Sequence, residues 1–104
     1  MSTIQKYWRK HALQMAEFKS GYCVIPLVVC KDGFEMSVQA SGGHYCAPRD
    51  LVRSGAYSHW EVAAGENEPD PLGRYRSHDG IYAMVPTEVI DAIIAEHGGL
   101  DSDK

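Results

Sequence analysis

Apolar side chains recur at helical spacing near the start of the chain. They fall on one side of a helix between residues 4 and 18, and only Leu13 lies opposite. The stripe consists of Ile4, Tyr7, Trp8, His11, Met15 and Phe18. This pattern predicts an amphipathic helix within residues 1–21, with a wide face that packs on a flat surface. The side-chain oxygen of Ser2 or Thr3 can cap its first turn, and Gly21 can end it.

Four later segments have the patterns of β-strands. Residues 23–30 are short and strongly apolar, but Pro26 has no N–H for a ladder and so marks an edge or a bulge. Residues 34–41 alternate instead, which is typical of a half-buried strand. One face carries Phe34, Met36, Val38 and Ala40, and the other carries Glu35, Ser37, Gln39 and Ser41. Two more strands are expected at 57–63 and 81–85, and the second is apolar on both faces and therefore central.

Turn and helix signals separate these strands and close the chain. Asp32-Gly33 predicts a hairpin between the first two strands, because this dipeptide accepts the positive φ that tight turns require. Pro86 suits the first turn of a helix over residues 86–99, and Gly98-Gly99 would stop that helix. Residues 100–104 are expected to be a flexible tail. The order is therefore α-β-β-β-β-α.

The predicted fold is an α+β domain with an antiparallel four-stranded sheet over residues 22–85 and both helices on one of its faces. With 104 residues the chain is long enough for one modest core. The net charge of −4 disfavours direct nucleic-acid binding. No signal peptide or membrane-spanning run is recognisable. Three cysteines without signs of export indicate reduced thiols and a cytoplasmic location.

Two long segments without a regular pattern, residues 41–56 and 64–79, are where function is expected. They hold His44, Tyr45, Arg49 and Arg53 in the first segment, and Arg74, Tyr75, Arg76 and His78 in the second. Guanidinium groups bind phosphate or carboxylate with paired hydrogen bonds, and aromatic faces stack on rings. If the segments meet at one end of the sheet, they form a pocket for an anionic ligand such as a nucleotide. Otherwise these are solvated loop residues offset by nearby carboxylates.

Cysteine and histidine side chains permit two other kinds of chemistry. Cys23, Cys30, His44 and Cys46 could supply zinc ligands, but the Cys-x2-Cys knuckle that makes such a signal strong is missing. Cysteine in an apolar strand is more commonly a small buried hydrophobe. Cys46 with His44 or His59 could instead form a nucleophile and base, although no oxyanion site is recognisable. Glu61 is expected to be a solvated carboxylate, and no cofactor is expected.

A distinctive pattern covers most of the chain beyond residue 22. It reads DGFxxSVQAS over residues 32–41 and YCxPR over residues 45–49, and a VPxExI helix that ends in HGG follows at residues 85–99. This pattern resembles a group of small uncharacterised bacteriophage proteins, for which no activity or catalytic residues are established. The resemblance implies an accessory protein that binds host machinery, as anti-CRISPR and other anti-defence inhibitors do.

The first functional hypothesis is therefore a non-enzymatic phage protein that inhibits a host defence complex, either protein or ribonucleoprotein, in the cytoplasm of an infected cell. Its binding surface would comprise the two long segments and the polar strand face with Glu35, Ser37 and Gln39. The acidic balance suits docking on a basic channel. The alternatives are a protein that sequesters a nucleotide signal through the arginines, a small metal or thiol enzyme, and a virion component. The Pro26 edge or the face of the second strand can mediate a homodimer.

Overall fold

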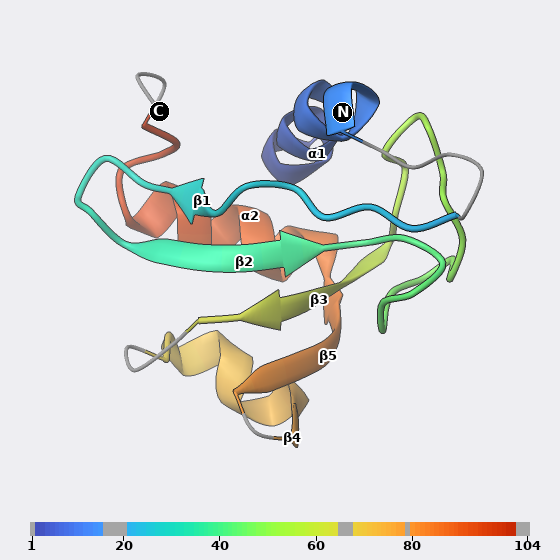
Figure 1. Ribbon diagram of the computed structural model, residues 1–104. Coiled ribbons are helices and arrows are strands. Elements are labelled where there is room, and N and C mark those ends of the chain that lie inside the picture. The colour runs from blue at the N-terminus through green and yellow to red at the C-terminus, as the bar shows by residue number, and fades with distance from the viewer. Residues whose placement is uncertain (1, 16–20, 65–67, 79, 102–104) are drawn as a thin grey trace.

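The computed structural model describes residues 2–15, 21–64, 68–78 and 80–101 (Figure 1). Its elements are α1 (Thr3–Met15), β1 (Val28–Val29), β2 (Glu35–Gln39), β3 (His59–Ala63), the 3₁₀-helix η1 (Asp70–Tyr75), β4 (Arg76–His78), β5 (Ile81–Pro86) and α2 (Thr87–Glu96). The strands form one antiparallel sheet in the order β1-β2-β3-β5-β4. The α+β class is confirmed, but the sheet has five strands rather than four. The additional strand, β4, consists of Arg-Ser-His, which has no apolar alternation, and it exists because it pairs with β5.

The start of α1 follows the local sequence. Ser2 Oγ accepts a hydrogen bond from Gln5 N–H at 3.1 Å, and Gln5 Oε1 accepts one from Ser2 N–H at 3.0 Å. This reciprocal capping box satisfies backbone donors that the first helical turn leaves unpaired. A carboxylate of α2 adds to it, because Asp91 Oδ1 accepts from Ile4 N–H at 2.9 Å. Residues 16–20, over which the helix was expected to continue, lie outside the described residues.

The first predicted strand is reduced to Val28–Val29, and the reason lies at Pro26 and Gln39. Val28 pairs with Met36 in the antiparallel β1–β2 register. If this register continued, Ile25, three residues before Val28, would lie opposite Gln39, three residues after Met36. The Gln39 side chain takes the place of the ladder there: Oε1 accepts from Ile25 N–H at 2.9 Å, and Nε2 donates to Ile25 O at 3.0 Å. Gln39 is buried as a result. The prediction that Gln39 belongs to an exposed polar working face is therefore wrong.

Three aromatic side chains, Trp8, Tyr57 and Trp60, form the centre of the core. All three are fully buried, with ring centroids 5.1 Å apart for Trp8–Tyr57 and 5.2 Å for Tyr57–Trp60. Their polar atoms are also satisfied: Trp60 Nε1–H donates to Thr87 Oγ1 at 2.8 Å, and the Thr87 hydroxyl donates to Tyr57 O at 2.7 Å. Trp8 Nε1–H donates to Ala40 O at 3.1 Å. The trio thus joins both helices to the sheet.

The chain after α2 returns to the edge of the sheet at β1. Gly98 and Gly99 both have φ of +91° and turn the chain, and α2 ends at Glu96, two residues before the double glycine that was expected to stop it. Lys31 N–H then donates to Gly99 O at 3.0 Å, and Asp101 N–H donates to Val29 O at 2.9 Å. The expected flexible tail is therefore wrong for residues 100–101, and residues 102–104 lie outside the described part. This return also covers the edge of the sheet over residues 29–31.

Candidate functional site

The two arginine-bearing segments leave the sheet at opposite ends. β2 and β3 are antiparallel neighbours, so the chain that follows β2 and the chain that follows β3 depart in opposite directions. In Figure 1 the green segment after β2 lies on the right, and the chain after β3 leaves on the left. The structure therefore does not bring the four predicted arginines into one pocket.

The second segment folds into η1 and β4, where its charges serve local structure. Arg76 forms an ion pair with Glu68, and the Tyr82 hydroxyl donates to the same Glu68 oxygen at 2.6 Å. The hydrogen bond from Tyr82, and to a smaller extent the one from Arg76, holds the pKa of Glu68 below its ordinary value. Arg74 is exposed at the end of η1, and Tyr75 is half-buried against the core. The side chain of His78 lies outside the described part.

The first segment packs back against β3 and buries His44 and Cys46. Ala47 pairs with His59, and Ala47 N–H donates to His59 O at 3.1 Å. His44 is buried: its Nδ1 is 2.7 Å from Ser41 Oγ, and its ring stacks on Tyr22 with a centroid separation of 5.1 Å. Burial lowers the pKa of His44, which favours the neutral ring. His44, predicted as a residue that binds a ligand or partner, is therefore not exposed on the surface of this segment.

Tyr45 is held through its backbone on two sides. Its N–H donates to Glu61 Oε2 at 2.8 Å, and its carbonyl accepts from Met84 N–H at 3.2 Å. The second bond depends on an irregularity in β5, because the β3–β5 register shifts between Trp60 and Val62 and leaves an extra residue in β5. Met84 lies in this bulge with φ of +55°, the only positive φ of a non-glycine residue in the described chain.

The result is an exposed patch formed by Tyr45, Arg49 and Met84, called here the Tyr45 patch. Tyr45 is 43% exposed and Met84 is 42% exposed, and the Arg49 guanidinium lies 5.3 Å from the centroid of the Tyr45 ring. A non-glycine residue in the left-handed region costs roughly 1–2 kcal/mol, and such strain persists where the surrounding structure enforces it. Tyrosine, arginine and methionine are the residues enriched at the buried centres of protein interfaces.

Of the residues predicted from the sequence, the structure brings Tyr45 and Arg49 together. Arg53 is exposed farther along the same segment, and Glu35 is exposed at the start of β2, at the other end of that strand. Glu61, expected to be a solvated carboxylate, instead positions Tyr45. Met84 was missed because a residue in an apolar central strand gives no sign that a bulge turns it outward.

The cysteine geometry disfavours both metal and thiol chemistry. Cys46 is buried, and its thiol donates to Ser41 O at 3.2 Å. Burial raises the pKa of Cys46, and also the pKa values of Cys23 and Cys30, so that the thiol is favoured over the reactive thiolate. The Nδ1 atom of His59 pairs with Ser58 Oγ at 2.8 Å. The described residues contain no group of three or more His, Cys, Asp or Glu side chains arranged to hold a metal.

We expect the folded protein to resist thiol reagents. Ellman's reagent at neutral pH should label none of the three cysteines rapidly, because all are buried and protonated, and should label all three in denaturant. The absorbance of the released thiolate gives the count in each state. Rapid labelling of one cysteine in the folded protein would contradict this assignment.

Among the described residues, no helix is both long and apolar enough to cross a bilayer. Comparison with protein-family models, with curated proteins and with solved structures found no match for this chain. What the Tyr45 patch can bind is therefore given by its own side chains and geometry.

Proposed function

We propose that this protein acts by binding a protein partner through the Tyr45 patch. The observation that carries the proposal is the backbone of Tyr45, fixed on one side by Glu61 and on the other by the strained Met84. An aromatic side chain on a rigid backbone loses little conformational freedom when it binds, so more of the contact energy contributes to affinity. Arg49 beside it would pair with a carboxylate of the partner.

We further propose that the partner is a host defence complex. The resemblance to small bacteriophage proteins supports this class of partner. The overall charge of −4 also favours approach to a complex with a basic channel, because complementary fields accelerate association. In this proposal the protein inhibits by occupying a surface, and catalysis plays no part.

Alanine substitutions in the Tyr45 patch test the proposal. Purified host nuclease or CRISPR effector complexes would be titrated with the protein, and both binding and target cleavage would be measured. We expect Tyr45→Ala to weaken binding by about thirtyfold, as for an interface hot spot of about 2 kcal/mol. Arg49→Ala should weaken it less. Leu27→Ala is the matched control, because Leu27 is 49% exposed but lies outside the patch.

Met84→Gly separates binding from folding. Glycine accepts φ of +55° without strain, so we expect stability to be unchanged or raised by up to about 1 kcal/mol while binding falls with the loss of the side chain. Urea denaturation measures the first quantity and the titration measures the second. Equal binding by wild type, Tyr45→Ala and Met84→Gly would overturn the proposal.

A further inference from the structure

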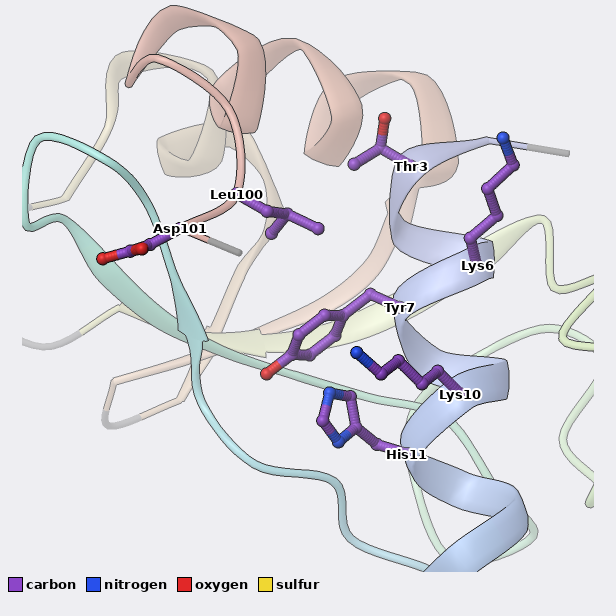
Figure 2. Close-up of a pocket in the computed structure, with 7 residues that line it drawn as sticks. All are labelled: Thr3, Lys6, Tyr7, Lys10, His11, Leu100 and Asp101. Carbon is purple, nitrogen blue, oxygen red and sulfur yellow. The ribbon is translucent and has the colours of Figure 1, made fainter. Parts of the chain in front are cut away.

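A second candidate site lies on α1, which contributes no residue to the Tyr45 patch. A groove of about 270 Å³ runs between this helix and the returning C-terminal segment (Figure 2). The helix supplies Thr3, Lys6, Tyr7, Lys10 and His11, and the opposite wall is formed by Leu100 and Asp101. Amino groups and aromatic rings thus border one concave surface with an apolar side chain across from them.

The aromatic wall of the groove is held in place by the protein itself. The Tyr7 hydroxyl donates to Leu27 O at 2.7 Å, which fixes the ring from its far end. The His11 ring lies 4.4 Å from the Tyr7 ring, centroid to centroid, at an interplanar angle of 50°. Because Tyr7 and His11 are four residues apart on one helix, their rings face the groove together. A flat ligand would meet a preformed wall.

The charge of α1 is opposite to that of the chain as a whole. The protein has a net charge of −4, yet the sequence of α1 contains Lys6, Arg9 and Lys10 and no carboxylate. Both Lys6 and Lys10 line the groove, and Figure 2 shows Lys6 extending toward its Thr3 end. Neither lysine forms an ion pair with a described residue. Figure 2 shows the Lys10 side chain extending toward the Tyr7 and His11 rings. An anion beside these rings would therefore lie close to an amino group that pairs with no carboxylate among the described residues.

We propose that this groove binds a small aromatic anion, meaning a ring that carries one phosphate or carboxylate group. The ring would lie against Tyr7 and Leu100, and the anionic group would be bound by Lys10, while Lys6 at the Thr3 end of the groove would add a longer-range attraction. The volume is slightly below the range of drug-sized pockets, which favours a compact ligand. This inference is independent of the partner proposed for the Tyr45 patch.

The test is a titration of ¹⁵N-labelled protein followed by NMR. Adenosine monophosphate is the phosphate probe and phenylacetate is the carboxylate probe. Adenosine and inorganic phosphate serve as controls that carry only half of the proposed chemistry. We expect saturable shifts of α1 and Leu100 amides with at least one probe, with binding about tenfold tighter than that of either control. Affinity should fall with added salt, because the lysines are exposed.

Two variants locate the charge requirement. Lys6→Gln with Lys10→Gln should weaken binding of the effective probe by about tenfold or more, and Arg9→Gln should leave it nearly unchanged. Arg9 is the matched control because it is an exposed cation of the same helix that does not line the groove. The amide spectra themselves report whether each variant is folded. No saturable shift with either probe, or equal losses from Arg9→Gln and the double variant, would overturn the proposal.

Discussion

Replacing Tyr57 with alanine is expected to lower the free energy of unfolding by about 3–5 kcal/mol, as for other large aromatic side chains removed from a core. The Tyr57 ring is fully buried between Trp8 and Trp60, so a cavity would open at the centre of the aromatic trio. Domains of this size are stable by about 5–15 kcal/mol, so the variant should be close to unfolding at physiological temperature. Urea denaturation followed by tryptophan fluorescence measures the change.

Tyr57→Phe isolates the contribution of the hydroxyl. That group donates to Asp50 O at 2.6 Å and accepts from Val52 N–H at 2.7 Å, so phenylalanine leaves two backbone groups unpaired. We expect a loss of about 1–3 kcal/mol. Tyr45→Phe is the control, because Tyr45 is 43% exposed and does not belong to the core. A Tyr57→Phe variant as stable as this control would show that the two backbone groups find other partners.

The same substitution also changes the response to alkaline pH. Burial raises the pKa of Tyr57 to about 12, from an ordinary value of about 10. The folded state therefore retains a proton that the unfolded state loses above pH 10, and stability should fall as the pH rises from about 10 to 12. The Tyr57→Phe variant lacks the ionisable hydroxyl and should not lose this stability. The free energies of unfolding of the wild type and the variant should therefore converge toward pH 12.

Gln39→Leu is expected to lower the free energy of unfolding by about 2–4 kcal/mol. Leucine fills a similar volume but pairs with neither Ile25 N–H nor Ile25 O, and a buried backbone group without a partner costs about 1–3 kcal/mol. Hydrogen exchange should show faster exchange of the Ile25 amide in the variant, and urea denaturation should give the total loss.

Two further variants define what Gln39 contributes. Ser37→Ala removes only the hydrogen bond that Gln39 Nε2 donates to Ser37 Oγ at 2.9 Å, and should cost about 1 kcal/mol. Glu35→Gln alters an exposed residue of the same strand and should be near neutral. Unchanged protection of the Ile25 amide in Gln39→Leu would show that the side chain does not replace the ladder at this position.

The features predicted correctly from the sequence are those set by neighbouring residues. The N-cap oxygen, predicted from Ser2 or Thr3 and supplied by Ser2, the turn at Asp32-Gly33 and the double glycine after α2 each depend on contacts within a few residues. Periodicity also located both helices and the strands β2, β3 and β5. Such signals are local, because they come from backbone propensity and from the side that each residue presents.

The formation of β4 and the burial of Gln39 and His44 depend on tertiary contacts, which the sequence pattern did not reveal. β4 is polar and forms only by pairing with β5, and Gln39 is buried because Ile25, fourteen positions earlier, lies opposite it. His44 lies in a segment without helix or strand, as the sequence indicated, but it is buried where that segment packs against β3. Alternation shows which side of a strand a residue occupies, but not what the rest of the chain places over it.

In the candidate sites too, local sequence gives the residue types and tertiary contacts bring them together. Tyr45 and Arg49 were named from residue type alone, but their support from Glu61 and Met84 joins positions 16 and 39 residues away from Tyr45. The α1 groove was not predicted, since Lys6 and Lys10 have the pattern of a solvated helix face and the opposite wall comes from the far end of the chain. Local sequence therefore specifies the elements and their side-chain chemistry. Which side chains share a surface is decided by strand order and packing, because these depend on free-energy differences between long-range pairings that no short segment encodes.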